Sequence, residues 1–137
     1  MKRVCIATHG EFASGIISAA SIIAGEKANV DFLNAYVGEV SFPSQLESYF
    51  DSCTDSDEIY FLTDMFGGSV NQAVMKYLSQ YPNLHIMTGI NLPLILEFVL
   101  SENWNEEALR QMVEQAKTAV IYVNDVLKAE SKDDFDF

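Results

Sequence analysis

Apolar residues occur in two patterns along this chain. Short runs of consecutive apolar residues, many of them β-branched, alternate with longer stretches in which apolar positions recur every three or four residues. Consecutive runs are typical of strands buried on both faces, and the wider spacing is typical of helices with one buried face. The runs predict strands at about 3–8, 30–36, 57–63, 84–88 and 119–126, and the spaced stretches predict helices at about 12–24, 43–52, 69–80, 92–100 and 106–117.

The order of these elements is β-α-β-α-β-α-β-α-α-β, which predicts an α/β fold with a mainly parallel sheet. If the sheet winds in both directions from the first strand, helices cover both of its faces in a doubly wound three-layer α/β/α arrangement. The first and third strands then lie side by side at a switch point, where ligands bind beyond the carboxyl ends of the strands. We therefore expect the residues that follow these two strands to face one crevice.

Polar residues follow both strands. Thr8-His9-Gly10 follows the first strand, and Thr63-Asp64-Met65-Phe66-Gly67-Gly68-Ser69 follows the third. A neutral imidazole is a nucleophile through its unprotonated nitrogen, and a carboxylate that accepts a hydrogen bond from the other nitrogen fixes that tautomer. His9 and Asp64 therefore form a candidate catalytic pair.

Gly67, Gly68 and Ser69 form a candidate phosphate-binding segment beside this pair. Two glycines let the backbone approach a ligand closely, and the free N–H groups at the start of the next helix favour an anion. The Ser69 hydroxyl either caps this helix or donates a hydrogen bond to a phosphoryl oxygen, while Asn71 and Gln72 either face outward or pin the loop. The residues alone favour a phosphate site or an acyl site, because both chemistries need positioning and charge stabilisation.

Length and charge exclude several classes of function. The chain of 137 residues suits one domain, expected at 1–128, with 129–137 as an acidic tail. A net charge of -12 argues against binding to nucleic acid or to anionic membrane surfaces. The apolar runs are shorter than the roughly 20 residues of a membrane span, and the N-terminal run lacks a signal-peptide cleavage site. We therefore expect a cytoplasmic protein.

Neither metal nor cofactor chemistry is expected. Cys5 and Cys53 lie in or beside predicted core elements, form no Cys-x-x-Cys pattern, and are expected to be reduced thiols. The end of the first strand lacks the acidic cluster of a receiver domain and the hydroxyl-rich loop of a flavin-binding module. The chain also contains no Gly-x-Ser-x-Gly nucleophile elbow of an esterase.

The two motifs resemble the mannose-type IIA proteins of the bacterial phosphoenolpyruvate-dependent sugar phosphotransferase system. The matching segments are Ala7-Thr8-His9-Gly10, with the Ala-rich helix that follows it, and Leu62-Thr63-Asp64-Met65-Phe66-Gly67-Gly68-Ser69-Val70-Asn71. The resemblance covers nearly the whole chain in element order. It implies that His9 carries the phosphoryl group, that Asp64 holds its ring, and that Ser69 is the hydroxyl at the helix start.

The resemblance also implies a phosphotransferase with defined partners. Phospho-HPr is the donor, and a IIB component is the acceptor that phosphorylates the sugar entering through the membrane IIC and IID components. The membrane components select the sugar in these systems, so this chain need not contact it. Because the chain ends soon after the last predicted strand, we expect IIB to be a separate polypeptide.

Two structural expectations accompany this resemblance. Family members are homodimers in which the C-terminal strand, here 119–126, joins the partner's sheet antiparallel. Met65 and Phe66 stand where family members often carry Thr and Trp, so no phosphate contact is expected from Met65. Phe12, Met65 and Phe66 are either ordinary packing residues or an apolar ring around His9 on which HPr and IIB dock.

Two alternatives share the fold. The phosphoryl donor subunit of dihydroxyacetone kinase resembles this family and also uses a histidine near its N-terminus, but the motif after its third strand usually differs from the one found here. A non-phosphorylated regulatory domain of the same fold is the second alternative. It predicts that His9 is never phosphorylated.

Overall fold

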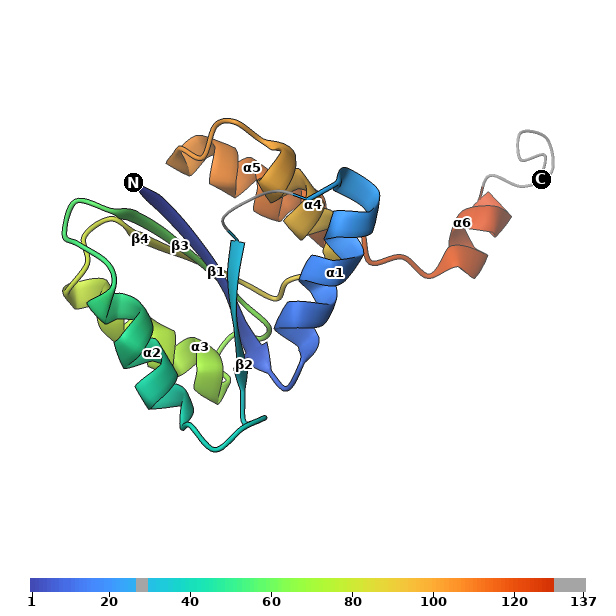
Figure 1. Cartoon of the computed structure of the whole chain (residues 1–137). Helices are drawn as coiled ribbons and strands as arrows, with labels where there is room; N and C mark the ends of the chain where they lie inside the picture. Colours follow the sequence, from blue (N-terminus) through green and yellow to red (C-terminus); the bar gives the residue numbers. More distant parts are fainter. Residues whose placement is uncertain (27–29, 130–137) are drawn as a thin grey trace.

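In the computed structural model, which describes residues 1–26 and 30–129, four strands form one parallel sheet between two layers of helices (Figure 1). The strands lie in the order β2-β1-β3-β4, and each neighbouring pair is parallel. Their bounds are β1 Lys2–His9, β2 Val30–Ala35, β3 Glu58–Thr63 and β4 Leu84–Thr88. The predicted α/β class and the pairing of the first strand with the third are confirmed.

Five helices cover the two faces of the sheet. One face packs against α1 (Phe12–Ala24), α4 (Leu92–Leu100) and α5 (Glu106–Lys117), and the other packs against α2 (Phe42–Asp51) and α3 (Ser69–Met75). In Figure 1 these two groups lie on opposite sides of the strands. The α-helix predicted at 69–80 ends earlier than expected, at Met75, and the chain continues from there as the 3-10 turn η1 (Lys76–Ser79).

Alternation along β1 and β3 divides the core between these faces. Val4, Ile6, Tyr60 and Leu62 pack toward α1, α4 and α5, whereas Cys5, Ala7, Ile59 and Phe61 pack toward α2 and α3. Successive side chains of a strand point to opposite faces, so a strand buried on both faces needs apolar residues at consecutive positions. This explains the consecutive apolar runs of the sequence.

The centre of the sheet is a topological switch point. The chain leaves β1 into α1 on one face and leaves β3 into α3 on the other, and the register pairs Ala7 with Thr63. His9 and Asp64 therefore emerge at the same edge of the sheet, as the fold class predicts.

The turn that carries His9 is fixed by a buried hydrogen bond. Glu11 occupies the N-cap position of α1 but makes no side-chain hydrogen bond to the helix. Instead the Thr8 hydroxyl, at the end of β1, accepts a hydrogen bond of 2.7 Å from the N–H of Ala13. Thr8 and Ala13 are both fully buried, so water cannot replace this acceptor.

The predicted C-terminal strand is wrong for the single chain. Residues 120–122 have no regular structure, and helix α6 (Val123–Ala129) follows them with no buried residue. Figure 1 shows this segment leading away from the body of the molecule. A strand exists only beside a strand to which it can hydrogen bond, and within the described residues no antiparallel strand pairs with this segment. Val120, Ile121, Tyr122 and Val123 are consequently exposed.

The division into a domain at 1–128 and a tail at 129–137 stays a prediction. Helix α6 runs across that boundary to Ala129, and the acidic residues 130–137 lie outside the described part of the chain. Among the residues that are described, none of the helices combines the length and the apolar character needed to cross a bilayer.

Replacing Thr8 with Val tests the role of the buried cap. Thr8→Val keeps the shape of the side chain but leaves the N–H of Ala13 without an acceptor, and should lower the free energy of unfolding by about 1–3 kcal/mol in urea denaturation. Thr8→Ser is the matched control, since it keeps the hydroxyl and should cost only the lost methyl, about 0.8 kcal/mol. A Thr8→Val protein as stable as the wild type would contradict this role.

Candidate active site

His9 and Asp64 form a hydrogen-bonded pair at the carboxyl edge of β1 and β3. Oδ2 of Asp64 lies 2.8 Å from Nδ1 of His9, and the same oxygen accepts the backbone N–H of His9 at 2.9 Å. An ionised carboxylate only accepts hydrogen bonds, so Nδ1 carries the proton and Nε2 of the neutral ring is unprotonated. The His9 side chain is 43% exposed, so a partner can reach the ring.

Asp64 is itself held as a carboxylate. Partial burial acts to raise its pKa, but the hydrogen bonds from the backbone and ring of His9, and the attraction of the ring whenever it is protonated, outweigh burial and lower the pKa below its usual value. The stabilisation is therefore fully present above the ordinary Asp pKa of about 3.9 and is lost as the pH falls through the lowered folded-state value. The other carboxylate oxygen accepts the N–H of Met65 at 3.1 Å.

A second polar group lies on the other side of the imidazole. The Ser69 hydroxyl oxygen lies 3.3 Å from Nε2 of His9, and the Tyr36 hydroxyl lies 2.6 Å from that of Ser69. The rings of His9 and Tyr36 have centroids 5.5 Å apart and are tilted by 43°. Ser69 therefore does not cap α3: Gly68 is the N-cap residue, and the Ser69 side chain turns to the histidine.

The two glycines allow the loop to approach His9. Gly67 has a φ of +80°, in the left-handed region that favours glycine. A Cβ atom on Gly68 would lie 2.9 Å from Cγ of Met65, which would have to shift, and would make van der Waals contact with Cε1 of His9 at 3.5 Å. The first turn of α3 has no side-chain cap, which leaves N–H groups beside the crevice.

Asn71 and Gln72 pin this loop. Asn71 is only 1% exposed, and its amide accepts the N–H of Gly67 at 3.1 Å and donates to the Thr63 hydroxyl at 3.0 Å. Gln72 donates to the carbonyl of Gly67 at 2.6 Å. Of the two interpretations that the sequence left open for these residues, the one in which they hold the loop is confirmed.

The apolar residues suggested as a docking ring are at the surface. Phe12, Met65 and Phe66 are 46%, 58% and 76% exposed, which does not fit ordinary core packing. Sequence reasoning missed the loop after β2, which adds the exposed apolar residues Tyr36, Val37 and Val40. A positive-φ aromatic residue after a strand leaves no simple sequence signal.

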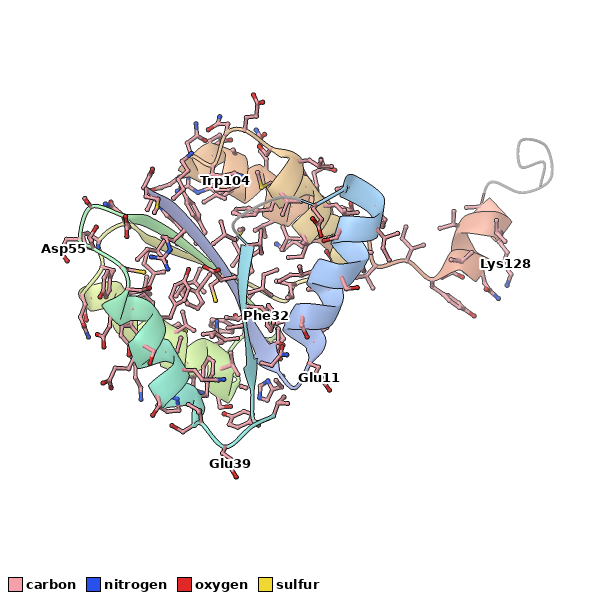
Figure 2. The ribbon with its side chains drawn as sticks, in the orientation of Figure 1. Glu11, Phe32, Glu39, Asp55, Trp104 and Lys128 are labelled. Carbon is pink, nitrogen blue, oxygen red and sulfur yellow. The ribbon has the colours of Figure 1, made fainter. Side chains whose placement is uncertain are left out.

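Figure 2 shows two acidic side chains at the same end of the molecule, Glu11, two residues after His9, and Glu39, in the loop after β2. In the part of the chain that the structure describes, no group of three or more His, Cys, Asp or Glu side chains is arranged to hold a metal ion. Cys5 and Cys53 are free thiols, and burial raises the pKa of each.

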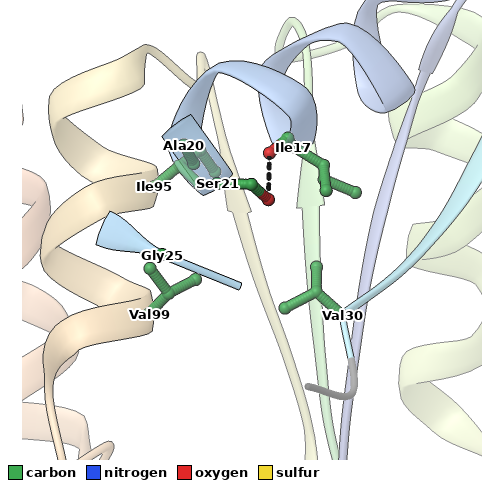
Figure 3. A pocket seen from close by; sticks show the side chains of 7 residues that line it. All are labelled: Ile17, Ala20, Ser21, Gly25, Val30, Ile95 and Val99. Atoms are coloured by element: carbon green, nitrogen blue, oxygen red, sulfur yellow. Dashed lines mark hydrogen bonds between the residues drawn. The ribbon is translucent and has the colours of Figure 1, made fainter. Parts of the chain in front are cut away.

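An apolar pocket lies elsewhere, between α1, α4 and the start of β2 (Figure 3). Its lining residues are Ile17, Ala20, Ser21, Gly25, Val30, Ile95 and Val99. The Ser21 hydroxyl donates to the carbonyl of Ile17 at 2.9 Å, so its proton is not available to a ligand. At about 50 Å³ the cavity is much smaller than a site for a small molecule.

Comparison with known sequences identifies relatives of the chain. The family model described as "PTS system fructose IIA component" matches residues 3–124. The fructose-specific EIIA component of Bacillus subtilis is 29% identical over 71% of this chain and 68% of its own length. The mannose-specific EIIAB component of Escherichia coli is 25% identical over 73% of this chain, but the match spans only 32% of that longer protein.

A solved structure shares the fold over most of the chain. It is a protein of Klebsiella pneumoniae described as a candidate phosphoenolpyruvate-dependent sugar phosphotransferase system permease, with 32% sequence identity and a TM-score of 0.86. The superposition covers 92% of this chain and 93% of the other. The resemblance found in the two sequence motifs is therefore confirmed, and this chain belongs to the fructose and mannose family of IIA components of the sugar phosphotransferase system.

Proposed function

We propose that this protein is a phosphoryl carrier that accepts a phosphoryl group from phospho-HPr on Nε2 of His9 and passes it to a histidine of a IIB component. The observation that carries the proposal is the pairing of His9 Nδ1 with Asp64 at 2.8 Å, which leaves Nε2 of this partly exposed ring as the nucleophilic atom.

The transfer is an in-line displacement at phosphorus. The lone pair of Nε2 forms the new N–P bond as the N–P bond to the HPr histidine breaks, and the electrons of that bond return to the HPr ring. Nδ1 keeps its proton throughout, so the His9 ring gains positive charge. The Asp64 carboxylate stabilises this charge without taking the proton.

The phosphoryl oxygens need donors in the same place. The Ser69 hydroxyl, 3.3 Å from Nε2, is positioned to donate to one of them. The uncapped first turn of α3 offers N–H groups, and Gly67 and Gly68 leave room for the oxygens beside the ring. Positioning and charge stabilisation are the main requirements of phosphoryl transfer.

The surface around His9 suits short-lived partners. Transient interfaces are enriched in aromatic residues and Met, and Phe12, Met65 and Phe66 are exposed. The name of the Escherichia coli relative joins an A and a B component, which is consistent with IIB as the acceptor. In this proposal IIB phosphorylates the sugar that enters through the membrane IIC and IID components.

The C-terminal segment supports a homodimer. Val120, Ile121, Tyr122 and Val123 are between 55% and 82% exposed, and they find no strand partner among the described residues of their own chain. Pairing of the segment 119–126 with the sheet of a second copy would bury these side chains and give the backbone of residues 120–122, which has no regular structure in the single chain, hydrogen-bond partners.

The first test is intact-protein mass spectrometry after incubation with phosphoenolpyruvate, enzyme I and HPr. We expect one acid-labile phosphoryl group that requires HPr, and its complete absence in His9→Ala, because the variant has no nucleophile. His85→Ala is the matched control and should be phosphorylated like the wild type. No phosphoryl group on folded wild-type protein would overturn the carrier function and favour a non-phosphorylated regulatory domain.

Asp64→Ala should slow the transfer from phospho-HPr by about 10²-fold, the usual loss when one electrostatic contact to a transition state is removed. Rapid-quench kinetics measures the rate, and circular dichroism should show an intact fold. Asp55→Ala, which removes a carboxylate at the opposite end of the molecule (Figure 2), should leave the rate unchanged. An unaltered rate in Asp64→Ala would mean that the carboxylate does not assist His9.

The dimer is tested by sedimentation velocity. The wild type should sediment at twice the chain mass, and Ile121→Asp should shift it toward the monomer, since a charge would enter the buried interface. Val40→Asp changes an equally exposed apolar residue in the loop after β2, outside the C-terminal segment, and should remain dimeric. A monomeric wild type at micromolar concentration would exclude the proposed exchange.

A further inference from the structure

Tyr36, directly after β2, has a backbone conformation that is unusual for its residue type. Its φ is +67°, and among the described residues it is the only non-glycine residue with a positive φ. The left-handed region is strained for a bulky side chain, and such strain persists only where the surroundings enforce it. The side chain is also 60% exposed, so core packing does not account for the conformation.

The end of β2 is tied to the turn that carries His9. The N–H of Gly10 donates to the carbonyl of Ala35 at 2.9 Å. The Asn34 side chain accepts the N–H of Ser14 at 3.3 Å and donates to the Ser14 hydroxyl at 3.0 Å. With Asn34 and Ala35 fixed in this way, the left-handed turn at Tyr36 directs its ring across the sheet edge toward α3.

The Tyr36 hydroxyl reaches the reacting nitrogen through Ser69. Because Nδ1 of His9 donates to Asp64, Nε2 is an acceptor, and the Ser69 hydroxyl 3.3 Å away must turn its proton toward it. The hydrogen bond of 2.6 Å between Tyr36 and Ser69 then runs from the phenol to the serine oxygen. We infer that Tyr36 is a positioning residue, which orients and polarises the Ser69 hydroxyl that faces Nε2.

This role rests on the proposed function of His9 and extends it. When Nε2 bonds to phosphorus, it ceases to be an acceptor, and the Ser69 hydroxyl turns to donate its hydrogen bond to a phosphoryl oxygen instead. Tyr36 still donates to the Ser69 oxygen, which keeps the serine proton directed at the phosphoryl group and strengthens it as a donor. No proton leaves Tyr36 or Ser69, and Tyr36 contacts neither the phosphoryl group nor Nε2.

A double-mutant cycle tests the relay. Tyr36→Phe removes only the hydroxyl and should slow transfer from phospho-HPr by about 3- to 10-fold, as expected for one ordinary hydrogen bond. In a Ser69→Ala background the same change should have almost no further effect, because the group through which it acts is gone. Tyr77→Phe, in the 3-10 turn after α3, is the matched control and should transfer at the wild-type rate.

A nitrogen-15 NMR spectrum of the unphosphorylated protein tests the same relay without transfer. Tyr36→Phe should move the Nε2 resonance of His9 toward that of an imidazole nitrogen free of hydrogen bonds. Ser69→Ala should move it further, and the double variant should match Ser69→Ala.

The outcomes separate the two proposals. A wild type that is never phosphorylated would overturn the carrier function, while the NMR comparison would still decide whether Tyr36 acts on His9. A Tyr36→Phe protein with wild-type transfer and an unmoved Nε2 resonance would overturn the positioning role. So would a Tyr36→Phe loss that persists in full in the Ser69→Ala background, because Tyr36 would then act independently of Ser69.

Discussion

One oxygen of Asp64 accepts two hydrogen bonds from His9, one from the backbone N–H at 2.9 Å and one from Nδ1 at 2.8 Å. The first fixes the end of β1 against the end of β3, and the second selects the tautomer in which Nε2 carries the lone pair. Both depend on the parallel pairing of Ala7 with Thr63, which brings the two residues to one edge of the sheet. The unprotonated nitrogen, the Ser69 hydroxyl beside it and the proposed transfer all follow from this arrangement.

A buried polar network supports this edge from below. The Thr63 hydroxyl accepts from Asn71 and donates to the Thr88 hydroxyl at 2.8 Å, so it joins β3, α3 and β4. Thr63 and Asn71 are almost completely buried, where an unsatisfied polar group would be costly. The network therefore resists rearrangement and holds the glycine loop, whereas Ser69 and Tyr36 above it remain accessible to partners.

The C-terminal segment shows where a local pattern is insufficient. Residues 119–126 have the apolar, β-branched composition of a strand, yet the single chain forms α6 from Val123 and leaves Val120 to Tyr122 exposed. Composition reports that a segment can be buried in a sheet but does not specify which sheet, because strand pairing is a long-range interaction. In the proposed dimer, the segment would form the buried strand that its composition predicts by pairing with the sheet of a second copy.

The sequence by itself determined the α/β class, the parallel central strands and the convergence of His9 with Asp64. Local apolar patterns identify the buried strands and the helices, and the order of these elements predicts the switch point. It also located Gly67, Gly68 and Ser69 at the start of α3. Only the tertiary structure decided that Ser69 turns to Nε2 instead of capping its helix, that Asn71 is buried beneath the loop, and that Tyr36 reaches Ser69. These contacts join residues far apart in the chain through distances of a few ångströms, and neither residue type nor spacing fixes such distances.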